Sequence, residues 1–260
     1  MAQNLQGLLS RTISKLSRNE SLTPYLEQAI VQANWPEEYA IKVHNKERVW
    51  DGYFHPSSDA ANEELFLYYK FSEAGRLKWE PFSPGSIMAM QIGSAIHALV
   101  ESMLIHLEFT TPEFCEVPFI NEKNWCSGTV DVQRVTLRDG SGETPPIEIK
   151  SCSVLPQKVS KAHILQLQPY LDMACGEPQD YGIVLYIEKS YPHRLGEFRV
   201  ERDQALLDSV YAKWSRVRDA IESKGPTTTM QNCCNPNTTI HYECPARFIC
   251  RQGPPKPSGT

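Results

Sequence analysis

The chain lacks several features that would place it in a common class of protein. It has no uninterrupted apolar run long enough to cross a bilayer, and its first residues do not have the layout of a secretory signal. It also lacks an excess of basic charge, because 31 acidic residues outnumber 26 lysines and arginines and leave a net charge of −5. These absences argue against a membrane-spanning, secreted or nucleic-acid-coating protein. They predict a cytoplasmic protein, or one in the host cytoplasm if the gene belongs to a phage.

Cysteine is absent from the first 114 residues and is unevenly placed in the rest of the chain. Four cysteines are scattered in apolar contexts and are predicted to be inert core residues: Cys115, Cys126, Cys152 and Cys175. The other four crowd the C-terminal part. Because no secretory signal is present, disulfides are not expected, and this second group is better explained as a metal site.

The chain does contain an ordinary globular composition, 41% hydrophobic and 22% charged, over a length that buries one good core. Apolar residues at helical spacing predict helices over 5–16, 22–33, 60–71, 83–107, 159–174 and 203–224. Short apolar runs predict strands over 116–120, 127–137, 146–152, 181–187 and 196–201. This order predicts an α/β fold with a central mixed sheet flanked by helices.

Local signals refine this outline. Ser83-Pro84-Gly85 predicts a helix start, and the apolar residues that follow form a wide face as far as Leu104. The turn sequence over 138–142 predicts a hairpin between the strands on either side, and residues 55–59 are predicted to form a loop. The predicted segments are an N-terminal helical segment 1–54, a core 55–225, a cysteine cluster 226–252 and a disordered tail 253–260.

Three residues of the predicted strands carry the strongest chemical signal. Asp131 lies mid-strand among β-branched residues, where a carboxylate is costly unless it is paired or binds a metal. Glu148 and Lys150 are two positions apart on the next strand, so their side chains share one face. Two carboxylates hold Mg²⁺ or Mn²⁺, which polarises a phosphodiester and activates water. A lysine beside them orients that water or neutralises charge that develops on the phosphate.

Further candidates surround these three. The backbone carbonyl of Ile149 is a candidate to complete the coordination shell. His97 and Glu101 are four apart on a predicted helix and share one face, and an imidazole near carboxylates favours Mn²⁺ alongside Mg²⁺. Gln166 and Tyr170 form a second such pair, suited to hydrogen-bonding a phosphate and to stacking on a substrate strand. Gly93 allows the first of these helices to approach its neighbours closely.

Simpler explanations exist for each signal taken alone. An exposed hairpin with a salt bridge gives the same Asp and Glu-x-Lys letters, and a single histidine on an apolar helix is more often a core residue. A modest basic track comprises Lys150, Lys158, Lys161 and His163, and such a run is more often a solvated face. The conjunction of the motifs in this order, each on a suitable element, favours the functional explanation.

The order of these fragments resembles the motif set of the PD-(D/E)XK nuclease superfamily, specifically its RecB-type exonuclease branch, which includes Cas4 and Cas4-like phage exonucleases. The resemblance covers roughly residues 55–250 and rests on four fragments: Gly93-x-x-x-His97, Gly128-x-x-Asp131, Glu148-x-Lys150 and Gln166-x-x-x-Tyr170. It implies that His97, Asp131 and Glu148 are metal ligands and Lys150 the catalytic lysine. It also implies that Gln166 and Tyr170 lie near the DNA.

The resemblance also bears on the cysteine cluster, since that branch often holds a [4Fe–4S] cluster. The available ligands are Cys233, Cys234, His241, Cys244 and Cys250. The spacing of the last two cysteines is similar, but Asn62 stands where the first cluster cysteine is expected, and no Cys-x-x-Cys precedes Cys244. An iron–sulfur cluster, a tetrahedral zinc ion and no metal therefore all stay open.

The function predicted from the sequence is a metal-dependent DNA exonuclease that acts on single strands or duplex ends, with endonuclease activity also possible within the branch. One alternative is a DNA-end or single-strand binding subunit of a larger recombination or spacer-acquisition complex. The acid pair beside a lysine argues against pure binding. A second is a restriction-type endonuclease on the same fold. The expected partner is DNA, with a homo-oligomer or recombination proteins as further candidates and no membrane.

Overall fold

The computed structural model describes residues 18–19, 21–38, 51–72, 82–173, 175–223, 225 and 245–246. Its centre is a six-stranded sheet in the order β1-β6-β5-β4-β3-β2, in which β4 and β5 are parallel and all other neighbours are antiparallel. The strands are β1 Arg18–Asn19, β2 Cys115–Asn121, β3 Cys126–Val132, β4 Ile147–Cys152, β5 Tyr181–Glu188 and β6 Leu195–Glu201. The predicted fold class, a mixed sheet flanked by helices, is confirmed.

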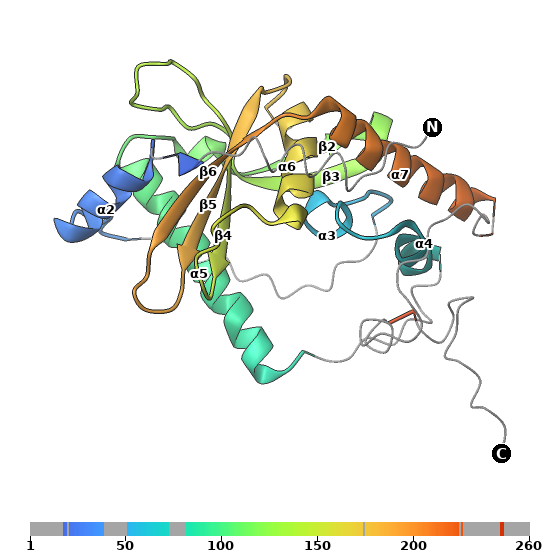
Figure 1. The fold of residues 1–260 in the computed structure, drawn as a ribbon, viewed down its shortest axis with the longest axis horizontal. Coiled ribbons are helices and arrows are strands. Elements are labelled where there is room, and N and C mark those ends of the chain that lie inside the picture. Colours follow the sequence, from blue (N-terminus) through green and yellow to red (C-terminus); the bar gives the residue numbers. More distant parts are fainter. Residues whose placement is uncertain are drawn as a thin grey trace.

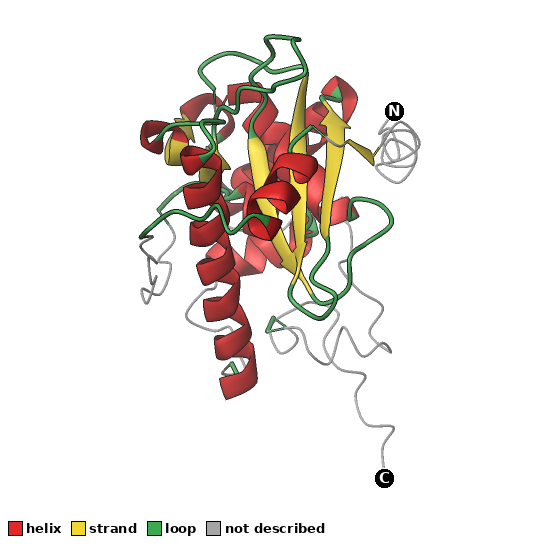
Figure 2. Cartoon of the chain, turned by 90° about the vertical axis from the view of Figure 1, so that its left-hand side faces the viewer, coloured by secondary structure: helices red, strands yellow, loops and turns green. Residues whose placement is uncertain are grey.

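Helices cover both faces of this sheet (Figures 1 and 2). They are α2 Thr23–Val31, α3 Pro56–Asp59, α4 Glu64–Ser72, α5 Pro84–His106, α6 Lys161–Met173 and α7 Gln204–Glu222, with short 3-10 turns η2 Pro112–Phe114 and η3 Glu122–Asn124. One face packs against α2 and α5, and the other against α4, α6 and α7. The α6 helix also makes the crossover between the parallel strands β4 and β5.

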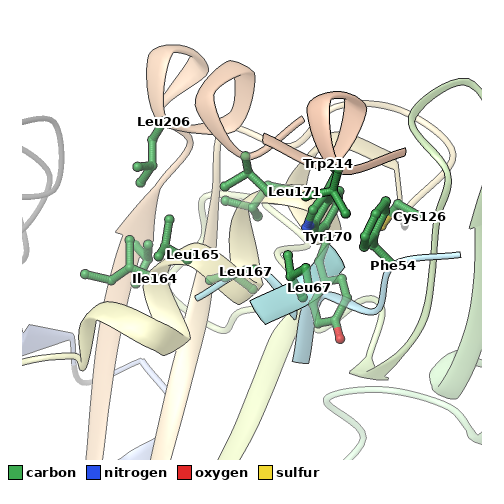
Figure 3. Close-up of a cluster of buried hydrophobic side chains, with 14 of the residues drawn as sticks. Phe54, Leu67, Cys126, Ile164, Leu165, Leu167, Tyr170, Leu171, Leu206 and Trp214 are labelled. Carbon is green, nitrogen blue, oxygen red and sulfur yellow. The ribbon is translucent and has the colours of Figure 1, made fainter. Parts of the chain in front are cut away.

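Strand periodicity explains why both faces are covered. On β5, Val184 and Tyr186 belong to the apolar cluster beneath α6 and α7, whereas Ile183 and Leu185 belong to the cluster beneath α2 and α5. Alternate side chains point to opposite faces, so a strand that is apolar at every position must be buried on both. Figure 3 shows the first cluster, in which Trp214 of α7 lies among side chains of α4 and α6.

The helix boundaries follow the local signals in the sequence. The Ser83 side chain caps α5 by accepting a hydrogen bond from the backbone N–H of Ser86. Asp203 caps α7 in the same way, with its carboxylate accepting from the N–H of Leu206. The predicted boundaries of these two helices are therefore confirmed to within two residues.

Three predicted elements differ from the structure. Residues 55–59 were predicted to form a loop, but Pro56–Asp59 form the short helix α3, because the buried carboxylate of Asp59 accepts from the N–H of His55 and closes the turn. The helix predicted to start at Ala60 starts at Glu64. The strand predicted to reach Leu137 ends at Val132, because the backbone beyond it bonds elsewhere, such as from Thr136 N to Phe109 O at 2.8 Å.

Only the second half of the apolar face of α5 is buried. Val100, Met103 and Leu104 are at most 6% exposed, whereas Met88 is 62% exposed and neighbouring apolar side chains are also exposed. Figures 1 and 2 show the first turns of α5 extending past the strands. By length and composition alone α5 has the dimensions of a membrane span, with a mean hydropathy of 1.3 over its most apolar window. Its second half instead packs on the sheet.

Candidate active site

The candidate site forms where β3 and β4 separate. The two strands share one antiparallel pair, Val132 with Ile147, and the ladder does not continue beyond it. In a continued ladder Asp131 would stand opposite Glu148. The carboxylate of Asp131 instead turns into the gap, where its Oδ2 accepts a 2.7 Å hydrogen bond from the backbone N–H of Ile149. The separated strands therefore bring an acidic side chain and unpaired backbone of β4 together.

The carbonyl of Ile149 faces the same gap. In an extended strand the N–H and C=O of one residue point to the same side, and the N–H of Ile149 points to Asp131. The Ile149 side chain is buried in the cluster beneath α5. This placement brings the predicted backbone ligand next to one of the predicted carboxylates.

Glu148 is a buried carboxylate with only half of its hydrogen-bonding capacity used. Its side chain is almost fully buried, and its Oε1 accepts from the ammonium of Lys150 and, at 2.5 Å, from the side-chain amide of Gln166. Its Oε2 is buried and has no hydrogen-bond partner among the described residues. Burial, followed by the charge of Asp131, raises the pKa of Glu148 to about 7, against the opposing effect of Lys150.

Lys150 projects from the same face of β4 as Glu148, as the two-residue spacing predicts. Desolvation lowers the pKa of its ammonium, but the charges of Glu148 and Asp131 outweigh this and raise the pKa overall. Lys150 is therefore a protonated cation held against the acids. Its strand neighbour on β5 is Tyr186.

His97 reaches Asp131 from the opposite face of the sheet. Its Nδ1 lies 3.6 Å from Asp131 Oδ1. A Cβ added to Gly93 would lie 3.3 Å from the hydroxyl of Ser151, so α5 passes close to β4 one turn before His97. Desolvation lowers the pKa of His97, but the hydrogen bond and charge of Asp131 raise it overall. The glycine therefore permits the approach that places the imidazole at the gap.

A carboxyl pair beside the site includes one residue that the sequence did not suggest. Glu101, one turn after His97, faces Glu116 of β2, and burial followed by the charges of Glu116 and Asp131 raises the pKa of Glu101 to about 8. Glu116 has a left-handed backbone, with φ of 53°. Such a conformation is uncommon for a residue with a side chain and cannot be inferred from the letter Glu. The pairs on either side of Glu116, Cys115 with Val132 and Val117 with Val130, place it near Asp131.

Gln166 and Tyr170 lie on α6 behind Glu148 rather than at the surface. Both are at most 5% exposed, and Gln166 donates to Glu148 and, at 3.4 Å, to the Tyr170 hydroxyl. Tyr170 packs edge-to-face against Phe119, and its hydroxyl points away from the apolar cluster in Figure 3. A Cβ added to Gly128 would lie 3.3 Å from the Tyr170 ring. In this structure the pair supports a carboxylate rather than presenting itself to solvent.

The donors around the gap fit a hard divalent cation. Among the described residues, no three His, Cys, Asp or Glu side chains stand close enough together to form a finished metal site. Lys150, Gln166 and the Ile149 N–H each donate a hydrogen bond to an oxygen of the two acids. The free Oε2 of Glu148 is the atom that a cation would satisfy. Asp131, the Ile149 carbonyl and His97 would complete an oxygen-rich set suited to Mg²⁺ or Mn²⁺.

The basic track predicted from the sequence is not a continuous charged surface. Lys150 is mostly buried and paired with Glu148. Desolvation and then the charge of Lys150 lower the pKa of His163 to about 4, so this imidazole is neutral near pH 7. Of the four residues in this predicted track, Lys158 and Lys161 are the exposed cations.

The four scattered cysteines are free thiols, of which only two are core residues. Cys126 and Cys175 are buried, and burial raises the pKa of each thiol, to about 11 for Cys175. Cys115 and Cys152 are only half-buried. The remaining predicted ligands lie outside the described residues: Cys233, Cys234, His241, Cys244 and Cys250. The helix predicted over 5–16 also lies outside them.

No protein-family model matches this sequence, and no curated protein matches it. The solved structures that are similar at low identity include the following two. The crystal structure of SSO0001 is similar over 95% of each chain, with a TM-score of 0.45 and 18% identity. An alkaline exonuclease from Laribacter hongkongensis, LHK-Exo, is similar over 66% of this chain and 89% of that chain, with a TM-score of 0.42 and 16% identity. At these values the likeness carries no argument about function, which rests on the site itself.

Proposed function

We propose that this protein is a metal-dependent deoxyribonuclease that hydrolyses phosphodiester bonds in single-stranded DNA or at DNA ends. The observation that carries the proposal is the buried Oε2 of Glu148, which lacks a partner although Lys150 and Gln166 hold the other oxygen. A buried polar atom without a partner is costly, and one that lies beside a second carboxylate is a candidate for an ion. A divalent cation is the ligand that suits a carboxylate beside a second carboxylate.

The residues of the site have different proposed roles. When bound, the cation would supply Lewis-acid activation of the phosphate and of a water molecule. Asp131, Glu148, the Ile149 carbonyl and His97 would hold it. Lys150 carries a fixed positive charge beside Glu148, where it suits a phosphate oxygen on which charge develops during hydrolysis.

Gln166 and Tyr170 orient the metal-binding acid. The amide of Gln166 holds one oxygen of Glu148 and leaves the other free for a ligand. Hydrogen bonds of this kind position ligands in metalloenzymes and tune their affinity. In this proposal the Gln-x-x-x-Tyr motif supports Glu148 and does not contact the substrate directly.

The first test is degradation of end-labelled single-stranded DNA with Mn²⁺, Mg²⁺ or EDTA, for the wild type and Lys150→Ala. Metal-dependent loss of label that disappears in the variant supports the proposal, and the label lost first gives the polarity. Linear and circular substrates of the same sequence separate an exonuclease, which needs ends, from an endonuclease. The control is Lys189→Ala. It removes a lysine that directly follows β5 and should leave the cleavage rate unchanged.

Absence of cleavage by pure, folded protein with either metal would overturn the nuclease assignment. Binding of the same labelled strands in that case would favour the alternative, a DNA-end or single-strand binding subunit. The iron–sulfur or zinc assignment for the C-terminal cysteines is a separate proposal. Metal analysis of protein purified without oxygen tests it directly, and a preparation without iron or zinc would contradict it.

A further inference from the structure

A histidine–tyrosine pair lies next to Lys150 and is not explained by the metal-binding residues. His163, in the first turn of α6, is half-buried, and its Nδ1 lies 2.6 Å from the hydroxyl of Tyr186. Tyr186 is 2% exposed and is the direct strand neighbour of Lys150. The pair therefore joins α6 to β5 at the point where Lys150 projects from β4.

The hydrogen-bond partners of Tyr186 favour one arrangement of the protons in this pair. The Tyr186 hydroxyl accepts a 3.2 Å bond from the backbone N–H of Ser160, and it has one proton of its own to donate. The acceptor that lies nearest to this proton is Nδ1 of His163 at 2.6 Å, and we assign the hydrogen bond in that direction, with Nδ1 as the acceptor. A neutral imidazole with an accepting Nδ1 carries its hydrogen on Nε2. The contact with Tyr186 fixes the ring orientation, and the assigned direction of the hydrogen bond sets the tautomer.

The surroundings of His163 explain why the ring stays neutral. Burial and the adjacent Lys150 ammonium both oppose a second positive charge there. Because Nδ1 turns inward to a buried tyrosine, Nε2 lies on the other side of a ring that is only half-buried. Nε2 has no hydrogen-bond partner in the part of the chain that the structure describes. The exposed cations Lys158 and Lys161 make this region favourable for an anion.

We propose that His163 is a substrate-positioning residue whose Nε2–H donates a hydrogen bond to a phosphate oxygen of the DNA strand next to Lys150. This inference rests on the proposed nuclease function. A neutral donor of fixed tautomer selects a hydrogen-bond acceptor by direction, whereas Lys150 attracts phosphate as a charge. Tyr186 and Ser160 act through His163 by fixing its orientation.

The tautomer is tested without any nuclease assay. Long-range ¹H–¹⁵N spectra of ¹⁵N-histidine-labelled protein, assigned with His163→Gln, should show His163 protonated on Nε2 between pH 6 and pH 8, a range chosen about two units above the pKa of about 4. In Tyr186→Phe the donor to Nδ1 is absent, so a mixture of tautomers should appear. A doubly protonated ring near pH 6, or an Nδ1–H tautomer in the wild type, would overturn the inference and leave the nuclease proposal untouched.

The substrate contact is tested by steady-state cleavage of a single-stranded oligonucleotide with Mn²⁺. His163→Leu should raise KM about tenfold or more, as expected for one lost hydrogen bond to a charged oxygen, with a smaller change in kcat. His163→Gln retains an N–H donor and should recover part of the loss. His106→Leu, an exposed histidine at the far end of α5, is the matched control and should leave KM unchanged.

The salt dependence of binding separates a neutral contact from a cationic one. Anisotropy of a labelled single strand in EDTA should show weaker binding by His163→Leu, with the same slope of log Kd against log salt as the wild type. A slope lowered by about 0.7 would mean that the ring binds phosphate as a cation and would overturn the inference. If His163→Leu leaves both KM and DNA binding unchanged, the phosphate contact of His163 is contradicted and the nuclease proposal is not. A wild-type protein that neither cleaves nor binds the DNA strand would instead contradict the nuclease proposal.

Discussion

Glu148 on β4 and Glu197 on β6 are both buried carboxylates of one sheet, but their surroundings differ. Glu197 accepts four hydrogen bonds from the start of α2, two from Ser21 to Oε1 and one each from the N–H groups of Leu22 and Thr23 to Oε2. Glu148 accepts through one oxygen only, and its other oxygen is buried without a partner. The first carboxylate is satisfied by its own chain and the second is not.

The difference distinguishes a structural acid from a functional one. Glu197 takes the place of a local cap, since Leu22 at the start of α2 has no side chain that can accept a hydrogen bond. Its contacts tie α2 to β6. Glu148 gains no comparable stability, because its free oxygen adds a desolvation cost. Glu64 also has a buried oxygen without a partner, because Arg216 holds only its Oε1, so the free oxygen of Glu148 points to function through its position beside Asp131 and Lys150. The following predictions test that comparison.

The largest effect is expected for the acids and the lysine of the gap. Asp131→Ala, Glu148→Ala and Lys150→Ala should each lower metal-dependent DNA cleavage by about a thousandfold or more, because each removes charge stabilisation that acts in the transition state. Single-turnover cleavage of end-labelled DNA gives the rates, and circular dichroism shows whether the variants fold. Full activity in all three folded variants would sink the assignment.

Glu197→Ala should have the opposite profile. Removing its carboxylate leaves three backbone N–H groups and one hydroxyl near the start of α2 without their acceptor. A loss of about 3–5 kcal/mol in the free energy of unfolding is expected, as for other buried hydrogen-bonded charges. Urea denaturation measures it. Cleavage per folded molecule should be retained, and a specific loss of cleavage at full stability would break the comparison.

Gln166→Leu should weaken the site without removing a ligand. The substitution deletes the donor that fixes Oε1 of Glu148, so the carboxylate loses its orientation. Metal affinity or activity should fall by about 10- to 100-fold, the range found for residues that support metal ligands. Titration of cleavage rate against Mn²⁺ concentration separates the two quantities. Gln168→Leu serves as the stability control. Gln168 also lies on α6, but its side chain bonds to β6 and to the start of α7 instead of to Glu148.

The fold was largely accessible from the sequence because its signals are local. The helix caps at Ser83 and Asp203 and the apolar run of β5 each depend on a few consecutive residues. The Glu148/Lys150 face followed from strand periodicity alone. The end of β3 was not accessible, because the bond from Thr136 to Phe109 that replaces the ladder joins residues 27 positions apart.

Only the part of the site that short sequence motifs encode could be predicted from the sequence. His97, Asp131, Glu148 and Lys150 were expected to converge, and the structure brings them together at the gap. The contacts of Glu116, Glu197 and His163 depend on a left-handed backbone or on partners far away in the sequence. No periodicity encodes such contacts. The exposed first half of α5 likewise could not be told from a buried one, because composition does not reveal what covers a helix.

The pH dependence of stability offers a test with metal present and absent. The folded-state pKa of Glu148 is raised from 4.5 to about 7, so the folded protein binds a proton more tightly than the unfolded chain. In EDTA this group should therefore lower stability as pH rises from about 4.5 to about 7. Mn²⁺ at about 100 times its Kd should restore about 2.7 kcal/mol at pH 8. Thermal melting measures both effects. A wild-type protein whose stability does not change with Mn²⁺ would contradict the metal site.

The smallest effect is expected for Glu148→Gln at pH 5. Below its raised pKa the Glu148 carboxyl is already protonated in the fold, and glutamine closely matches its shape and charge. Its amide oxygen can still accept from Lys150 and Gln166, so the free energy of unfolding should change by less than about 1 kcal/mol. At pH 8 the same variant should be more stable than the wild type in EDTA, because it cannot ionise. Glu197→Gln places an amide among four donors and should destabilise at both pH values, so equal behaviour of the two variants would erase the distinction between the acids.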